Sequence, residues 1–232
     1  MKVKDRMGIK NNIEKFRLQL KPYRASLIAV SKTHSVAKIQ EAYDAGQRAF
    51  GENRVQELLA KQPLLPPDIE WHLIGHLQRN KVKAIVPFVS LIHSIDSLKL
   101  LEEINTQASK QQRLVRCLLQ VYIAQEETKF GLDFKELYEL IQSSEVRSWT
   151  NVSIEGLMGI ATFTENRDQI RNEFRSLKKV FEDLKLLSLP DNIRMNLLSM
   201  GMSSDFEIGL EEGSTMVRIG TSIFGARPQT PP

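Results

Sequence analysis

Leu198-Ser199-Met200-Gly201-Met202-Ser203 and Val217-Arg218-Ile219-Gly220-Thr221 are the two stretches that decide the fold. Each is a short apolar run that breaks into small residues and is followed by a helix-like segment. In a parallel barrel, the loops after the seventh and eighth strands turn backbone N–H groups and a helix N-terminus toward an anion. The two stretches therefore predict the last two strands of a barrel, with a phosphate site at their ends.

Short apolar runs alternate with amphipathic stretches along the rest of the chain, which is typical of a parallel sheet connected by helices. The runs are 27–31, 48–50, 71–75, 91–94, 114–123, 153–160, 195–200 and 216–220, and the helical stretches are 36–45, 54–60, 78–86, 98–108, 134–141 and 169–187. This pattern predicts an α/β protein with a single (β/α)8 TIM-type barrel. The alternative is a doubly wound open sheet, which is disfavoured because no glycine-rich dinucleotide motif follows the first run.

An extra helix is expected before the barrel, because Ile9, Ile13, Phe16 and Leu20 have helical spacing. Pro22 is expected to end this helix. No linker or low-complexity stretch divides the chain, so one domain is expected over residues 1–232, with about 226–232 as a frayed tail.

Composition narrows the class of protein. The 232 residues carry a formal net charge of +4, and the basic excess forms no block of like charges, which argues against a nucleic-acid partner. No run is long enough to cross a membrane, no signal sequence is evident, and the single cysteine cannot form an internal disulfide. We therefore expect a cytoplasmic protein without a membrane partner. We also expect a monomer, because no second domain or coiled segment indicates a partner subunit.

Lys32 ends the first predicted strand on the face that Ile28 and Val30 share, which in a barrel is the interior. A lysine in a partly apolar setting has a lowered pKa, and its neutral amine can form a Schiff base with an aldehyde. The alternative is a lysine that extends from the strand end into solvent. Two phosphate-binding loops next to Lys32 in the closed barrel favour a phosphorylated carbonyl ligand.

Small residues after the last two strands are the candidate phosphate ligands. Gly220 allows close approach of the backbone, and Thr221 can cap a short helix over residues 221–224. Ser199, Gly201 and Ser203 offer the same chemistry after the seventh strand. The alternative is that these residues only end their strands.

Arg218 shares a strand face with Gly220 and is expected to point into the barrel, where its permanent charge needs a partner. A carboxylate, Glu52 or Glu155, is the structural possibility. A heterocyclic ring nitrogen is the functional one, because an arginine there would keep that nitrogen unprotonated.

His72 and His76 have the spacing of a helical metal pair. On a strand they would lie about 13 Å apart, at about 3.3 Å per residue, and could not share a metal, so no metal site is expected. His76, at a strand end, could line the ligand site. His34 and His93 are expected to be structural or solvated.

Asn53 has two interpretations, because it follows the second strand and precedes a helix. It is either an N-cap, with Gln56 completing a capping box, or a ligand contact. Lys129, in a polar loop after the fifth strand, is expected at the same end of the barrel, and Cys117 is expected to be a packed thiol in the fifth strand.

Taken together and in order, these segments resemble the pyridoxal 5′-phosphate homeostasis protein family, and the resemblance covers nearly the whole chain. The matching segments are Ala29-Val30-Ser31-Lys32-Thr33, Phe50-Gly51-Glu52-Asn53, Trp71-His72-Leu73-Ile74-Gly75-His76-Leu77-Gln78, Gly156-Leu157-Met158, 198–203 with Asp205, and 217–221 with Ile223-Phe224-Gly225-Ala226-Arg227. One departure is His34, where many relatives carry lysine; it lies just outside the strand that ends at Lys32.

The resemblance implies a barrel like the N-terminal domain of alanine racemase, with pyridoxal 5′-phosphate (PLP) held by Lys32 as a Schiff base. The other site residues that it implies are Ser199, Gly201, Gly220 and Thr221 near the phosphate, Arg218 near the pyridine nitrogen, and Asn53 and His76 near the ring. Members of the family are thought to buffer or deliver the cofactor and to affect amino-acid and keto-acid balance. PLP-requiring apo-enzymes are therefore the implied partners.

No catalytic residue is expected. Proton transfer at a substrate carbon requires a positioned acid or base besides the lysine. Tyr122 is the only tyrosine near a strand end and is expected to pack in the core, and no second, β-rich domain of the racemase kind is expected. A non-catalytic PLP carrier is therefore the favoured hypothesis. The alternatives are a small racemase-like enzyme that uses Lys32 as its base and an anion-binding regulatory module.

Overall fold

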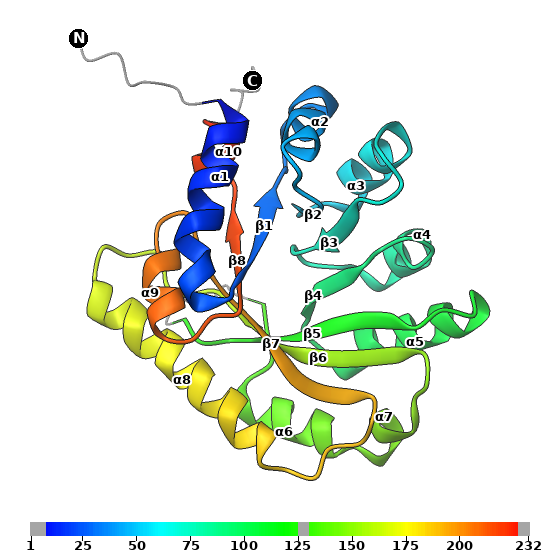
Figure 1. Ribbon diagram of the computed structural model, residues 1–232. Helices are drawn as coiled ribbons and strands as arrows, with labels where there is room; N and C mark the ends of the chain where they lie inside the picture. The colour runs from blue at the N-terminus through cyan, green and yellow to red at the C-terminus, as the bar shows by residue number, and fades with distance from the viewer. Residues whose placement is uncertain (1–7, 125–129, 227–232) are drawn as a thin grey trace.

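Eight parallel strands close into a barrel in the computed structural model, which describes residues 8–124 and 130–226 (Figure 1). Neighbouring strands along the chain pair with each other, and β1 pairs with β8 to close the ring. The strands are β1 (Ser26–Val30), β2 (Ala49–Glu52), β3 (Glu70–Leu73), β4 (Leu91–Ile95), β5 (Val115–Val121), β6 (Val152–Gly159), β7 (Ile193–Met202) and β8 (Met216–Ile219). The closed ring confirms the predicted (β/α)8 barrel and excludes the open sheet.

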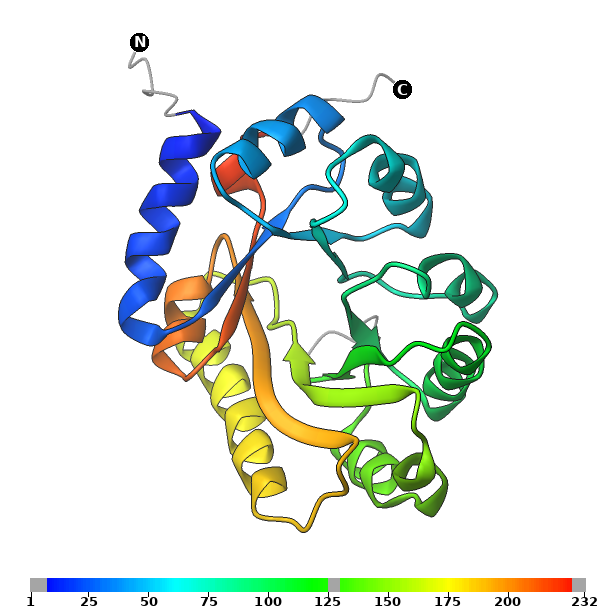
Figure 2. The ribbon, with the colours of Figure 1, turned by 45° about the vertical axis from the view of Figure 1, so that its right-hand side comes forward.

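Helices form a layer outside the strands, as Figure 2 shows. They are α1 (Ile9–Leu20), α2 (Val36–Asp44), α3 (Val55–Lys61), α4 (Val82–Ile85), α5 (Leu98–Lys110), α6 (Phe134–Gln142), α7 (Ser144–Ser148), α8 (Arg167–Lys185), α9 (Phe206–Glu211) and α10 (Thr221–Phe224). Three short 3-10 helices are η1 (Lys21–Tyr23), η2 (Gln62–Leu64) and η3 (Arg79–Lys81). Each strand is followed by at least one helix, which is the order that parallel pairing requires.

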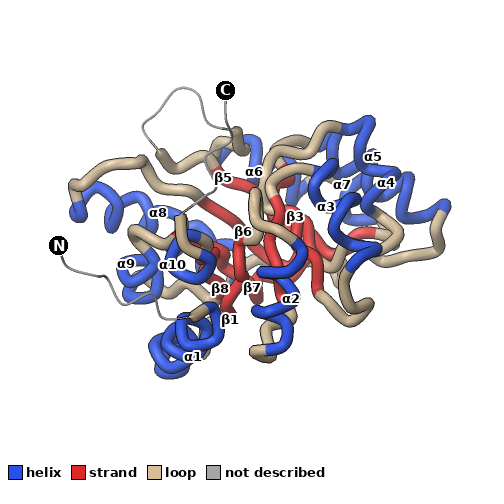
Figure 3. The backbone as a smooth tube through the Cα atoms, turned by 90° about the horizontal axis from the view of Figure 1, so that it is seen from above, coloured by secondary structure: helices blue, strands red, loops and turns tan. Residues whose placement is uncertain are grey.

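The predicted N-terminal helix, α1, brings the two ends of the described chain together. Its buried residues Ile9, Ile13, Phe16 and Leu20 form one face, and α1 contacts α2 and α10 (Figure 3). The Phe16 ring meets that of Phe206 edge-on, with ring centroids 5.4 Å apart. The helix ends where η1 begins, with Pro22 in the first turn of η1.

Strand residues alternate between two buried layers. Leu27, Ala29 and Phe50 face the helices and belong to the large apolar cluster between the strands and the outer layer. Ile28 faces the barrel interior, where it forms a separate cluster whose other fully buried members are Leu91, Leu118, Met158 and Met216. Burying one such side chain stabilises the fold by about 1.5–3 kcal/mol. This alternation decides which residues at the strand ends face the barrel mouth.

All eight predicted strands are present, whereas α7 was not predicted and α9 was expected only as a helix-like segment after 198–203, without bounds. Both are short, with five and six residues, and a helical period needs a longer segment to show. The predicted loop position of Lys129 and the predicted frayed tail from 227 onward lie outside the described residues. Within 8–124 and 130–226, no helix is both long and apolar enough to span a membrane.

Candidate functional site

A cavity of about 400 Å³ lies at the carboxyl ends of the strands. Its lining comes from segments that follow β1, β2, β3, β6, β7 and β8, so it is built by the folded barrel and not by one local motif. The lining residues are Val30, Lys32, Asn53, Ile74, Ile160, Phe163, Met202, Ser203, Ser204, Arg218, Gly220 and Thr221. A second cavity of about 790 Å³ continues from it and shares Ile160, Phe163, Met202 and Ser204.

The smaller cavity brings together five of the predicted site residues: Lys32, Asn53, Arg218, Gly220 and Thr221. Ser199, Gly201 and His76 do not line it. The apolar lining residues Ile74, Ile160, Phe163 and Met202 were not predicted, although they follow strands as the other site residues do. Position at a strand end was the signal that could have found them.

Lys32 is half-buried directly after β1, on the interior face that Ile28 and Val30 share. The chain turns sharply here, because the His34 N–H donates to the Ser31 carbonyl at 3.1 Å. Thr33 has a φ of 66°, a left-handed conformation that is costly for a β-branched residue. The turn keeps Lys32 at the cavity and leads the chain away into α2.

Asn53 also faces the cavity, and its Oδ1 is buried with no hydrogen-bond partner in the described part of the chain. The capping interpretation was wrong: the N-cap of α3 is Arg54, and no side chain caps that helix. An unpaired buried carbonyl oxygen costs about 1–3 kcal/mol, and such a cost in a cavity indicates a ligand that supplies the missing donor.

Arg218 is 4% exposed and lies in β8, pointing across the barrel. Its guanidinium donates to the Ser199 carbonyl at 2.8 Å, to the Ser199 hydroxyl at 2.7 Å and to the Gly159 carbonyl at 3.0 Å. Burial lowers the pKa of Arg218 to about 10, so the group stays charged at neutral pH. A buried cation held by neutral acceptors attracts an anionic or electron-rich ligand.

The two carboxylates considered as structural partners of Arg218 bind elsewhere, so that alternative is wrong. Glu52 accepts from Lys61 and Ser31, and Glu155 accepts from Ser153 at 2.6 Å and lies 3.7 Å from Arg116. Glu52 alternates outward with Phe50, toward the helices, whereas Glu155 is held by Ser153 and Arg116.

A chain of buried polar groups continues from Arg218 into the barrel. The Ser199 hydroxyl lies 3.1 Å from His93 Nδ1, and His93 Nε2 lies 2.9 Å from His72 Nδ1. His93 is fully buried and therefore structural, as expected. Burial lowers the pKa of His72 to about 3 and that of His93 well below 6.5, so both rings are neutral. Ser199, which contacts His93, thus orients the Arg218 guanidinium.

Acidification is expected to weaken the fold through these two histidines. Their pKa values in the folded state lie below the ordinary 6.5, so below that pH the unfolded chain binds more protons. The free energy of unfolding should fall by about 1.4 kcal/mol per pH unit for each ring, continuing to about pH 3 for His72. Urea unfolding between pH 7 and 4 measures the slope. His72→Gln should reduce the slope by about 1.4 kcal/mol per pH unit, which corresponds to one proton. An unchanged slope would contradict the neutral His72 ring.

Small residues and backbone groups also line the cavity. The Gly220 N–H donates to the Ser203 hydroxyl at 3.3 Å, and a Cβ at Gly220 would meet the Val30 carbonyl at 3.2 Å. Thr221 is not a cap, because Gly220 is the N-cap of α10 and no side chain caps that helix. Gly201, with a φ of 94°, lies against α9, where a Cβ would meet Phe206 Cα at 2.9 Å.

His76 lies outside this group. Its ring is exposed, 3.0 Å from the Asp96 carboxylate, and stacks on Phe130 with centroids 4.2 Å apart. In the described part of the chain, no group of three or more His, Cys, Asp or Glu side chains could hold a metal ion.

Comparison with known proteins gives one family, two curated relatives and one solved structure. The chain matches the family model for the alanine racemase N-terminal domain over residues 5–228. It is 43% identical over 204 residues to the pyridoxal phosphate homeostasis protein of Aquifex aeolicus, covering 88% of this chain and 87% of the relative. The human protein of that name is 39% identical over 213 residues, covering 87% and 76%. PipY of Synechococcus elongatus with PLP bound superimposes with a TM-score of 0.83 at 39% identity, covering 94% of this chain and 100% of PipY.

Proposed function

The chain belongs to the pyridoxal phosphate homeostasis proteins, which share the alanine racemase N-terminal domain, and from that membership we propose that it binds PLP through Lys32 and carries it. The observation that supports this best is the single cavity into which Lys32, Asn53, Arg218 and Gly220 converge. Three strand ends, those of β1, β2 and β8, carry the groups that such a cofactor needs: an amine, an amide, a cation and a glycine backbone.

The residues present fit the cofactor. PLP supplies an aldehyde that condenses reversibly with an amine, a pyridine ring and an anionic phosphate. Lys32 provides the amine, and the unpaired Oδ1 of Asn53 can accept a hydrogen bond from a ring substituent. Arg218, which stays charged at neutral pH, is the proposed donor to the ring nitrogen. Ser203, Gly220 and Thr221 are the proposed phosphate ligands, because hydroxyl and backbone N–H groups bind such an anion.

Among the described residues that line this cavity, Lys32 and Arg218 are the only ionisable ones. Cys117 is fully buried in β5, where burial raises the pKa of its thiol far above the usual value, so it offers no nucleophile. A racemisation needs a second acid or base at the substrate carbon, on the face opposite the lysine. This composition favours holding and releasing PLP over turnover, and apo-enzymes that require PLP are the proposed recipients.

Reduction with borohydride tests the proposal directly. The purified protein, mixed with PLP, is expected to gain visible absorbance, and reduction should fix a pyridoxyl group on the peptide that carries Lys32, as mass analysis would show. A modified peptide containing any other lysine, or no absorbance change at all, would refute the assignment. Exchange of an amino acid's α-proton with solvent, lost on changing Lys32, would show that the protein is an enzyme.

Asn53→Ala is expected to weaken PLP binding without lowering the stability of the PLP-free protein. The substitution removes the unpaired buried oxygen, so the melting temperature of the PLP-free protein should not fall. It also removes one hydrogen bond to the ligand, which should weaken PLP binding by about tenfold, about 1.4 kcal/mol. Absorbance titration measures the affinity and thermal unfolding measures the stability. A variant that melts lower yet binds PLP normally would show that Asn53 serves only the fold.

A further inference from the structure

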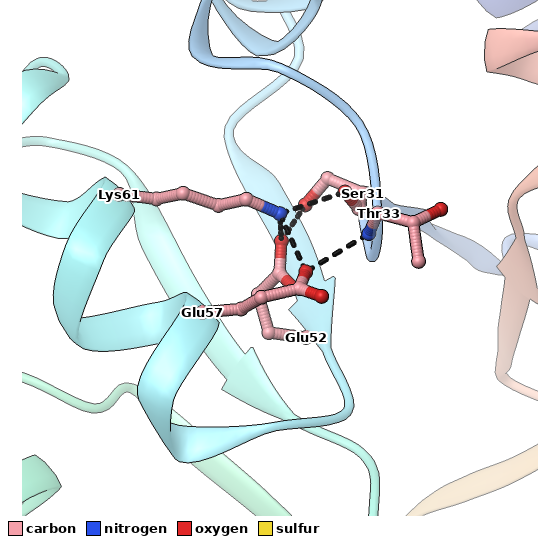
Figure 4. A network of polar contacts seen from close by, with 5 residues as sticks. All are labelled: Ser31, Thr33, Glu52, Glu57 and Lys61. Atoms are coloured by element: carbon pink, nitrogen blue, oxygen red, sulfur yellow. Dashed lines mark hydrogen bonds and ion pairs between the residues drawn. The ribbon is translucent and has the colours of Figure 1, made fainter. Parts of the chain in front are cut away.

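Lys61, at the end of α3, is a buried cation that makes three close contacts (Figure 4). Its Nζ donates to the Ser31 carbonyl at 3.0 Å, to Glu52 Oε1 at 2.8 Å and to Glu57 Oε2 at 2.8 Å. These contacts use all three ammonium protons. The three acceptors come from β1, β2 and α3, so one side chain ties together three elements that are separate in sequence.

This network lies directly behind the ligand cavity. Side chains alternate along a strand, so the neighbours of a residue that faces the barrel mouth point toward the helices. Ser31 precedes Lys32 in this way, and Glu52 precedes Asn53. The Ser31 hydroxyl donates to Glu52 Oε1 at 2.6 Å, which joins the ends of β1 and β2 under the helical layer. Lys61 therefore braces both strand ends that carry proposed PLP contacts.

The network also holds Thr33, on the other side of Lys32. The Thr33 N–H donates to Glu57 Oε2 at 2.9 Å, the same oxygen that accepts from Lys61. Thr33 has a φ of 66°, a left-handed conformation that is costly for a β-branched residue and persists only where surrounding contacts impose it. Glu57 is that contact. Lys32 is thus fixed by a hydrogen bond to the residue before it and another to the residue after it.

The charges in the network show that it is not a simple surface ion pair. Glu52 is fully buried, and its Oε2 has no hydrogen-bond partner within the described residues. Burial raises the pKa of Glu52 to about 7. Burial also acts to raise the pKa of Glu57, but the hydrogen bonds from Lys61 and Thr33 outweigh it and hold that pKa at about 2. Such a buried charged group adds little net stability over an apolar replacement, so its placement beside Lys32 calls for another role.

We propose that Lys61, Glu52 and Glu57 are positioning residues that fix the backbone on both sides of Lys32 and thereby preorganise its amine for PLP. The proposal rests on the function inferred above, because it assigns these residues to the same cavity. Without the network, Thr33 would leave its left-handed conformation, and PLP would have to restore the turn as it binds. The free energy needed for that ordering would appear as weaker binding.

The double variant Lys61→Met/Glu52→Gln tests this. Lys61→Met alone leaves Glu52 buried without its cation and would destabilise the fold, whereas adding Glu52→Gln removes that charge. Arg48→Met is the matched control, because Arg48 pairs with Asp68 at 3.0 Å at the other end of β2. Two quantities are measured: the dissociation constant of PLP, and the hydrogen-exchange rate of the Thr33 amide in the PLP-free protein.

We expect the double variant to melt near the wild-type temperature, to bind PLP at least about tenfold more weakly and to exchange the Thr33 amide at least about tenfold faster, with Arg48→Met unchanged. Should the double variant fail to fold, Glu57→Ala, which removes the half-exposed carboxylate that accepts from both Thr33 and Lys61, should show both changes. An unchanged exchange rate or an unchanged dissociation constant in a stable variant would overturn the proposal. If the wild-type protein bound no PLP, the proposed function would fail, while the exchange rate would still decide whether the network fixes the turn.

Discussion

Lys32→Ala is expected to abolish the visible absorbance and the borohydride-reducible adduct, and to weaken PLP binding by at least about a hundredfold, about 2.7 kcal/mol. The reason is chemical: Lys32 is the only lysine among the described residues that line the cavity. Losing its amine removes the reversible covalent bond, whereas the amide, the buried cation and the phosphate ligands remain. Absorbance titration of both proteins with PLP measures the difference.

Lys32→Arg is the control for charge. It keeps a cation near the phosphate ligands but cannot form a Schiff base, because its guanidinium stays protonated. If electrostatic attraction dominated, this variant would bind almost as well as the wild type. If the covalent bond dominates, as we expect, it should bind like Lys32→Ala. Neither substitution should lower the melting temperature much, because Lys32 is only half-buried.

Much of the barrel was predictable because its signals are local. A run such as 27–31 shows its own strand propensity, and the period of two places Ile28 and Lys32 on one face without reference to any other segment. The closed barrel then brings the ends of the first and last strands together. For that reason Lys32, Arg218 and Gly220 could be assigned to one cavity from the sequence.

The contacts that complete the site were not predictable, because they join residues distant in sequence. Lys61 ends an amphipathic helix, where a lysine is normally solvated, and only the packing of α3 on β1 and β2 buries it. A carboxylate was one of the two partners considered for Arg218, yet within the protein it binds Ser199 and the Gly159 carbonyl across the barrel. Asn53 fits a local capping pattern, but α3 begins one residue later than that pattern requires, with Arg54 as its N-cap.

Both halves of the site are held in place by contacts within the protein. The Arg218 guanidinium donates to Ser199, which in turn contacts the buried pair of histidines. The residues on either side of Lys32 hydrogen-bond to Lys61 and Glu57. Both supports lie in the protein and exist without a ligand. A carrier must bind its cargo reversibly, and preformed groups bind without the cost of ordering them first. Asn53 is the exception, because its buried Oδ1 has no hydrogen-bond partner among the described residues.

Gly156→Ala is expected to destabilise the protein by more than about 4 kcal/mol, enough to lower the melting temperature by about 8–16 °C or to prevent folding. Gly156 lies opposite Leu197 in the β6–β7 pair and has a φ of 150°. A Cβ there would lie 1.8 Å from the Leu197 carbonyl oxygen. That oxygen belongs to the backbone, so the two strands must separate, and truncating a side chain cannot relieve the clash. Thermal unfolding monitored by circular dichroism measures the loss.

Gly225→Ala separates the cost of the positive φ from the cost of the steric clash. Gly225 also has a positive φ, 84°, but a Cβ there would meet nothing within 4 Å. It should therefore cost only the conformational strain, about 1–3 kcal/mol, because its ψ of −174° puts it in a region that is almost restricted to glycine. Separation of β6 from β7 would also pull the Gly159 and Ser199 carbonyls apart, and Arg218 binds both. Any Gly156→Ala protein that does fold should therefore bind PLP weakly, whereas Gly156→Ala with normal stability and affinity would show that the strands can shift without disturbing Arg218.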